Sequence, residues 1–159
     1  MKEYLIPDLW NIVLQYCWPN TNDFHTLCEY GYYEKVAIIE DEISYITFDV
    51  ICKYNHKSMI KLIINKVVQI HKNENILNWD EGLYGACFNG DMEIINLMIK
   101  KGANDWDVGL NGACYGGNME IVKLMIEKGA NAWNLGYAGC FFNQGTEIMN
   151  LMIEKGAND

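Results

Sequence analysis

The second half of the chain carries a hydrophobic stripe with well-marked ends. Five apolar residues lie from Ile94 to Ile99, preceded by Asp91 and followed by two lysines and Gly102. An acidic cap, an apolar stripe, a cationic last turn and a terminal glycine are together the sequence signals of an α-helix. The pattern predicts a helix of about 11 residues after Asp91.

A shorter helix is predicted just upstream, over residues 83–89. Its spacing places Leu83, Ala86 and Cys87 on one face, while two glycines keep the other side thin. A short turn that contains Gly90 separates the two segments, so we expect them to run antiparallel as a helix pair.

The paired pattern recurs with a period of 27 residues. Three copies begin at Trp79, Trp106 and Trp133 and end at Asn104, Asn131 and Asn158. Two fainter copies appear upstream when equivalent positions of all copies are aligned. One such column of positions advances in steps of 24, 35, 27 and 27 residues. That column is Cys28, Cys52, Cys87, Cys114 and Phe141. The period predicts five helix pairs over residues 24–159.

One helix pair cannot bury its apolar stripe, whereas stacked pairs bury a continuous core. We therefore predict an all-α fold, an α-solenoid of about five helix pairs that forms a single domain over residues 1–159. Residues 1–23 are expected to form an N-terminal capping helix. Residues 24–78 are expected to form two degenerate repeats with a longer linker, and residues 79–159 three regular repeats.

The regular copies resemble ankyrin repeats. Residues 86–104 read Ala-Cys-Phe-Asn-Gly-Asp-Met-Glu-Ile-Ile-Asn-Leu-Met-Ile-Lys-Lys-Gly-Ala-Asn, which is similar to the family's A-A-x-x-G-H-x-E-I-V-x-L-L-L-x-x-G-A-D. The match recurs at residues 113–131 and, in a weaker form, at residues 140–158. Ankyrin proteins generally bind other proteins and perform no chemistry. The resemblance implies a non-enzymatic protein-protein interaction module that binds a host or viral protein through its short helices and loops.

The repeats also depart from the ankyrin pattern. The family's T-P-L-H opening is replaced by the sequence of residues 81–84, Glu-Gly-Leu-Tyr, and about six residues are missing from the usual length of about 33. We expect compact loops, such as residues 104–108, in place of projecting hairpins. Short repeats of this kind resemble ankyrin-like proteins of giant DNA viruses of amoebae, and a composition typical of AT-rich coding sequence fits that origin.

The N-terminal segment, residues 4–18, predicts an amphipathic helix. Apolar side chains recur on one face, with Pro7 in the first turn. The favoured interpretation is a cap on the first repeat. The segment is also similar to the first helix of F-box domains, so an adaptor that recruits a ubiquitin ligase is an alternative.

Composition narrows the choice of partners. The chain has a net charge of −9, a pI of about 4.7 and no arginine, which counts against nucleic acid. Charges interrupt every apolar run, so no membrane span is expected. The first eight residues carry two acids and do not resemble a secretion signal. The expected location is intracellular, in the host cytoplasm for a viral protein, with free thiols.

No residue constellation indicates catalysis, a metal site or a cofactor. The three histidines lie far apart, and no C-x-x-C pair occurs. The cysteine column is interpreted as inter-repeat packing and the repeated methionines as core. A recurring first-turn glutamate, at Glu34, Glu93, Glu120 and Glu147, is explained by the helix dipole.

A candidate binding face lies on the side of the short helices that the stripe leaves free. Its members are Tyr84, Phe88, Asn89, Asn111, Tyr115, Phe142 and Asn143, with Asp80 and Asp107 at the rim. Because this face is aromatic and acidic, the expected partner is a basic protein segment.

Two further features leave alternatives open. The three repeat tryptophans, predicted to lie in loops, either fold inward or stand in a row for a partner. Phe141 replaces a small residue in the last copy, which suggests a homo-oligomer that forms through the C-terminal repeat, as a self-assembling structural component. The target itself is not named by any motif.

Overall fold

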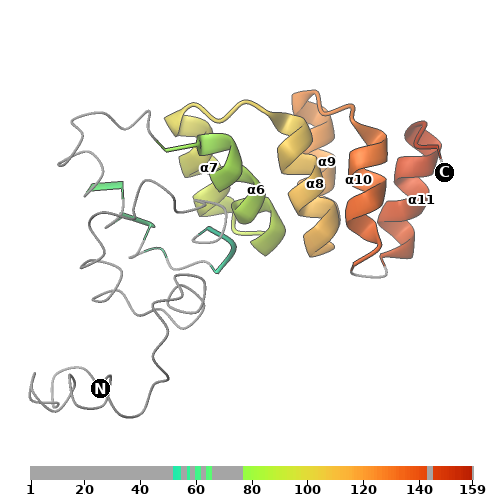
Figure 1. The fold of residues 1–159 in the computed structure, drawn as a ribbon, viewed down its shortest axis with the longest axis horizontal. Helices are drawn as coiled ribbons and strands as arrows, with labels where there is room; N and C mark the ends of the chain where they lie inside the picture. The colour runs from blue at the N-terminus through green and yellow to red at the C-terminus, as the bar shows by residue number, and fades with distance from the viewer. Residues whose placement is uncertain are drawn as a thin grey trace, which may run out of the picture.

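The computed structural model describes residues 52–54, 57, 60–61, 64–65, 77–142 and 145–158. Within these ranges it contains six labelled α-helices and no strand, so the all-α prediction is confirmed there (Figure 1). The predicted cap over residues 1–23, the adaptor-like segment 4–18 and the first degenerate repeat around Cys28 lie outside the described residues.

The helices alternate between two kinds. Those that open a repeat are α6 (Trp79–Asn89), α8 (Trp106–Gly116) and α10 (Trp133–Cys140). Those that close a repeat are α7 (Met92–Lys101), α9 (Met119–Lys128) and α11 (Thr146–Lys155). We call the two kinds first helices and second helices.

The second helices begin and end where the sequence predicts. Asp91 caps α7 by accepting hydrogen bonds from the N–H groups of Glu93 and Ile94, at 2.9 and 3.2 Å. Gly102 ends the helix with φ at 114°, a left-handed conformation that favours glycine. The same glycine end recurs after α9 and α11.

The first helices are longer than predicted. The helix expected over residues 83–89 begins four residues earlier, at Trp79, because the Asn78 side chain accepts hydrogen bonds from the N–H groups of Asp80 and Glu81. The interpretation of the tryptophans as loop residues is therefore wrong, since each one opens a first helix. The expected loop 104–108 shrinks to the connection 102–105.

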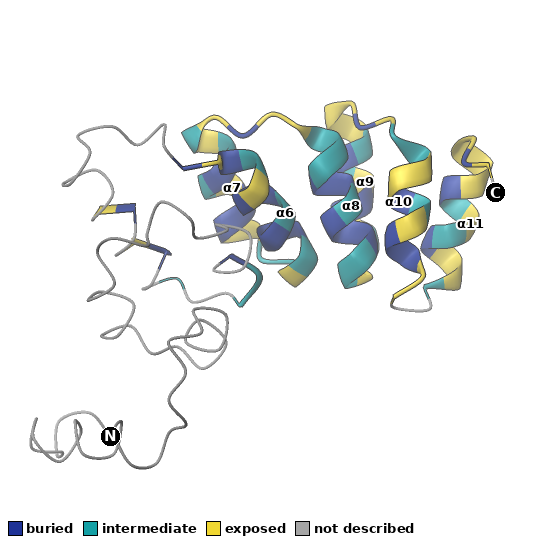
Figure 2. Cartoon of the chain, viewed as in Figure 1, coloured by how far each residue is buried: buried dark blue, intermediate teal, exposed yellow. Residues whose placement is uncertain are grey.

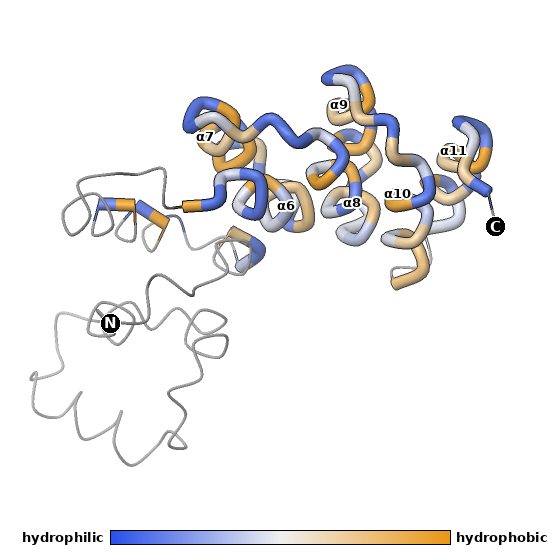
Figure 3. Tube along the Cα trace, turned by 45° about the horizontal axis from the view of Figure 1, so that its top comes forward, coloured by the Kyte–Doolittle hydropathy of each residue, from blue (hydrophilic) through white to orange (hydrophobic). Residues whose placement is uncertain are grey.

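The six helices form a row of three pairs in two layers. α6 packs against α8, and α8 against α10, while each first helix also packs against its own second helix. Figure 3 shows α7, α9 and α11 as one layer over a layer of α6, α8 and α10. Each step of 27 residues along the chain therefore corresponds to one step along the row of helix pairs.

The core runs through all three pairs, and buried positions recur on every helix (Figure 2). The described cysteines of the packing column, Cys52, Cys87 and Cys114, are fully buried, as predicted. The stripe methionines Met98, Met125 and Met152 are fully buried as well. Met92 differs, because it is the first residue of α7 and is 43% exposed. The core interpretation is wrong for Met92.

Glycine permits the close approach of the first helices. A Cβ atom placed on Gly112 would collide with the backbone carbonyl of Tyr84, and one on Gly116 with that of Phe88. These glycines leave α8 without side chains at two positions on the side that faces α6, which the sequence predicts for Gly112, the equivalent of Gly85, but not for Gly116. The short distance between the two helices places their outer side chains within reach of each other.

Candidate functional site

Each long edge of the row collects one set of helix ends. At one edge the first helices end and the second helices begin, and we call it the ladder edge. At the other edge the first helices begin with tryptophan and the second helices end with lysine, and we call it the tryptophan edge. The two edges differ in their chemistry.

The ladder edge carries a stack of aromatic rings, two from the last turns of α6 and α8 and a third, Phe142, from the turn that follows α10. The ring centroids of Phe88 and Tyr115 lie 5.5 Å apart, with the planes tilted by 38°. The rings of Tyr115 and Phe142 lie 4.3 Å apart and are stacked at 18°. The structure thus brings the rings of these three predicted residues together, and we call this stack the aromatic ladder.

The repeat geometry accounts for the stack. Phe88, Tyr115 and Phe142 occupy equivalent positions 27 residues apart, so packing the first helices side by side brings their rings together. Aromatic pairs at such separations contribute about 0.5–1.5 kcal/mol beyond their buried area. Phe88 and Tyr115 are half-buried, whereas Phe142 is 70% exposed.

A lysine covers the first ring of the ladder. The Nζ atom of Lys53 lies 4.2 Å from the ring centroid of Phe88, within the range of a cation–π contact. The Asn89 side chain holds the same segment by donating a hydrogen bond to the Lys53 carbonyl, at 2.9 Å. Asn89 therefore has a structural partner as well as a place on the candidate face.

The other predicted members of the face are placed less centrally. Tyr84 and Asn111 are half-buried on α6 and α8, one turn before the ladder. Asn143 lies outside the described residues. The aromatic ladder is therefore the part of the predicted face whose side chains the structure brings together.

Acidic groups lie at the same edge of the row as the ladder. Glu93, Glu120 and Glu147 lie in the first turns of the second helices, and all three are exposed. None of the three first helices has a basic residue in its last turn. The carbonyl ends of three roughly parallel helices thus add their negative potential to these carboxylates.

Lys57 meets this acidic edge at its first repeat. Its Nζ lies 2.5 Å from Glu93 Oε2 and 3.2 Å from Asp91 Oδ2. The hydrogen bonds to Glu93 and Asp91 raise the pKa of Lys57 above its usual value. No corresponding lysine contact is present at Glu120 or Glu147 in the part of the chain that the structure describes.

Lysine side chains lie close to the tryptophan rings at the tryptophan edge. Lys101 lies 5.7 Å from the Trp79 ring and Lys128 lies 5.1 Å from the Trp106 ring. Trp79 is 8% exposed, and Trp106 and Trp133 are half-buried against the glycines that end their own second helices. Of the two interpretations of the tryptophans, the structure favours the one in which they fold inward.

The predicted rim residues Asp80 and Asp107 are not at the candidate face. Asp80 Oδ1 accepts hydrogen bonds from the N–H groups of Asn104 and Asp105 at 2.8 and 2.9 Å, at the tryptophan edge. Asp107 Oδ1 binds the next connection in the same way. The rim prediction is wrong because first-turn residues of the first helices lie at the opposite edge from the ladder.

The end of the row exposes apolar side chains. Phe141 is 61% exposed and packs edge-to-face on Tyr137, with centroids 5.2 Å apart. It occupies the column position at which Cys87 and Cys114 are fully buried by the next pair. Leu135 and Ile153 are also exposed at this end.

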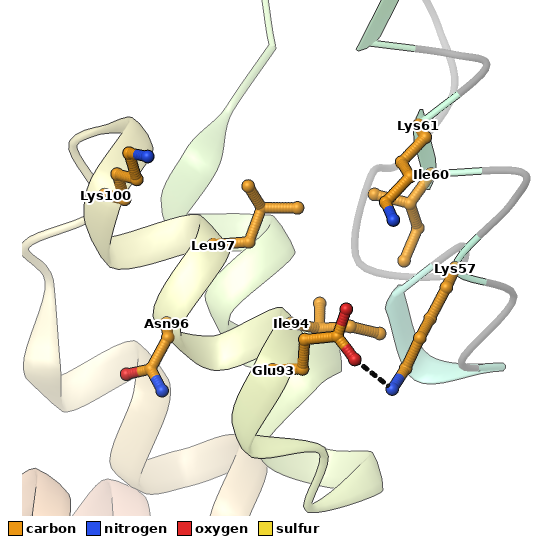
Figure 4. A pocket seen from close by; sticks show the side chains of 8 residues that line it. All are labelled: Lys57, Ile60, Lys61, Glu93, Ile94, Asn96, Leu97 and Lys100. Carbon is orange, nitrogen blue, oxygen red and sulfur yellow. Dashed lines mark hydrogen bonds and ion pairs between the residues drawn. The ribbon is translucent and has the colours of Figure 1, made fainter.

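A hollow that no sequence pattern indicates lies between α7 and residues 57, 60 and 61. The hollow encloses about 250 Å³ and has an apolar wall that includes Ile60, Ile94 and Leu97, with lysines at its rim (Figure 4). It lies where the regular 27-residue step gives way to the step of 35 residues. Only the spatial relation between these two segments reveals it.

The buried thiols have chemistry suited to packing. Desolvation raises the pKa of Cys87 to about 12, and it also raises the pKa of Cys114 and Cys140. These thiols are therefore protonated and weakly nucleophilic at neutral pH.

No group of three metal-binding side chains occurs among the described residues. None of the described helices is long and apolar enough to cross a membrane.

No protein-family model matches the chain, and no curated protein matches it.

Proposed function

We propose that the chain is an ankyrin-like α-solenoid that acts as a non-enzymatic protein-binding module. The observation that carries this proposal is the aromatic ladder, in which Phe88, Tyr115 and Phe142 form a continuous stack on the surface. Rows of stacked repeats present extended surfaces, and exposed aromatic side chains are enriched at protein interfaces.

The proposed partner is a basic protein segment that lies along the ladder edge. Its cations would meet the aromatic rings, the first-turn glutamates and the carbonyl ends of the first helices. A net charge of −9 favours the encounter with such a partner. The tryptophan edge is a weaker candidate, because Lys101 and Lys128 already cover two of its rings.

The test compares two triple variants as baits for proteins of a cell lysate. One changes Phe88, Tyr115 and Phe142 to alanine. The matched control changes Asn96, Lys123 and Asn150, exposed residues of the second helices at the same 27-residue spacing, to alanine. Circular dichroism shows whether both variants keep their helices.

The expected result is a basic protein that the wild type and the control retain and that the ladder variant loses. Retention by the folded ladder variant at wild-type level would contradict the proposal.

The exposed end of the row favours self-assembly as a second candidate function. Phe141, Leu135 and Ile153 offer an apolar surface that an additional pair, or a second copy, would cover. Light scattering over a range of concentrations tests this candidate. A mass that rises with concentration and returns to that of a monomer with Phe141→Asp is expected, and a constant monomer mass would exclude it.

A further inference from the structure

Lys53 extends the aromatic ladder by one position. Lys53 follows Cys52 in the packing column, just as Phe88 follows Cys87 and Tyr115 follows Cys114. Lys53 therefore occupies the ladder position of the preceding repeat, and its Nζ lies 4.2 Å from the Phe88 centroid. The chain itself places a cation at one end of the stack.

The two ends of the ladder differ. The last ring, Phe142, has one face stacked on Tyr115 at 4.3 Å and is nevertheless 70% exposed. Its other face therefore points away from the row. The position that Lys53 fills at the first end is open at the last.

The charges near the open end favour a cation there. α10 ends beside Phe142 without a basic residue in its last turn, and Glu147 lies in the first turn of α11 at the same edge. The lysines of the second helices, such as Lys128 and Lys155, are in last turns at the tryptophan edge. The chain thus keeps these cations away from the open ring.

We propose that the open face of Phe142 is a subsite for one cationic side chain of the partner, an arginine guanidinium. This rests on the proposed binding at the ladder edge. The planar, weakly hydrated guanidinium stacks on aromatic faces better than an ammonium does. The chain contains no arginine, so this group comes from another molecule.

The test uses the full chain with a blocked tetra-arginine peptide and a tetra-citrulline peptide of nearly the same shape without the charge. Ring signals of labelled phenylalanine are followed by NMR during the titration. Phe142→Leu keeps an apolar side chain and removes the ring. The control Asn150→Leu introduces the same side chain at an exposed residue of α11 outside the ladder.

The tetra-arginine peptide is expected to shift the Phe142 signals, and tetra-citrulline to leave them unchanged. Phe142→Leu should lower the affinity for the arginine peptide about two- to fivefold, which is the range of an exposed cation–π contact. Asn150→Leu should leave the affinity for the arginine peptide unchanged. Equal binding of the two peptides, or wild-type affinity in Phe142→Leu, would overturn the subsite.

The two proposals fail in different ways. Loss of arginine-peptide binding in the triple alanine variant, with full binding in Phe142→Leu, removes the subsite and leaves the ladder edge as the binding surface. Weaker peptide binding in Phe142→Leu, with unchanged capture of proteins by the triple variant, removes the proposed function and supports the subsite.

Discussion

The carboxylate of Asp107 accepts a hydrogen bond from the backbone N–H of Asn131, 24 residues away, at 2.7 Å. The same oxygen also accepts from the N–H of Ala132 at 2.8 Å. Asp80 makes the equivalent pair of bonds one repeat earlier, and Asn134 Oδ1 accepts from the Asn158 N–H at 2.8 Å one repeat later. A side chain at the start of each first helix therefore fixes the connection that leaves its second helix.

This bond predicts a graded effect of substitution at Asp107. Asp107→Ala should lower the free energy of unfolding by about 1–3 kcal/mol, because two backbone donors lose a charged acceptor. Asp107→Asn should lose less, since Asn134 shows that an amide oxygen can serve at this position. Urea denaturation of the full chain measures both. Equal losses of unfolding free energy in the two variants would show that the side-chain oxygen at position 107 does not stabilise the fold by accepting these hydrogen bonds.

The glycine contact between α6 and α8 predicts a large effect of one methyl group. Gly112→Ala should destabilise the chain by about 1–3 kcal/mol, because its Cβ would collide with the Tyr84 carbonyl and separate the helices. Asn96→Ala on the exposed side of α7 is the control and should cost nothing. Thermal denaturation compares the two. A Gly112→Ala variant as stable as the wild type would contradict the close approach.

The cation at the first end of the ladder predicts a smaller effect. Lys53→Met keeps the backbone carbonyl that Asn89 binds and removes only the charge over Phe88. The expected loss is about 0.5–1 kcal/mol. Lys61→Met, which changes an exposed lysine at the rim of the hollow, is the comparison and should leave stability unchanged. The interpretation of Lys53 as a ladder member would be wrong if the two variants behaved alike.

The buried thiols predict how stability depends on alkaline pH. Burial raises the pKa of Cys87 from 9.0 to about 12, so the folded thiol holds its proton while the unfolded one ionises. The stabilising effect is complete below pH 9 and is lost as the pH rises through the folded pKa. One such thiol gives a slope of about 1.4 kcal/mol per pH unit in this window.

Cys87→Ala should therefore flatten the decline between pH 9 and about 12, relative to the wild type. Denaturation at pH 7, where the thiol is protonated in both states, gives the effect of lost packing alone and serves as the reference. Parallel pH profiles for the two proteins would show that Cys87 is not protected from ionisation.

The sequence predicted the second helices closely, because local signals at both ends agree. Asp91 and Gly102 each act within one turn of α7, so their roles follow from chemistry that does not depend on the rest of the fold. The starts of the first helices were missed. Asn78 and Asp105 are good capping residues, but the tryptophans and acids that follow them are equally compatible with a loop.

For the candidate face, too, the sequence predicted one part correctly and missed another. The period alone placed Phe88, Tyr115 and Phe142 in one column, and any stacking of equal repeats brings such a column together. The roles of Asp80 and Asp107 depended on which connection lies near them, and that was not visible in the sequence. The inward placement of Trp79 likewise depends on where Lys101 ends its helix.

The sequence by itself thus determined the helical periodicity, the small residues between the first helices and the alignment of the aromatic column, because each of these repeats with the chain. Tertiary structure alone decided which face of each ring is covered and where a hollow opens beside α7. It also decided that Lys57 pairs with Glu93, whereas Glu120 and Glu147 have no lysine contact among the described residues. These properties depend on distances between residues that are far apart in the chain, and no local pattern specifies such distances.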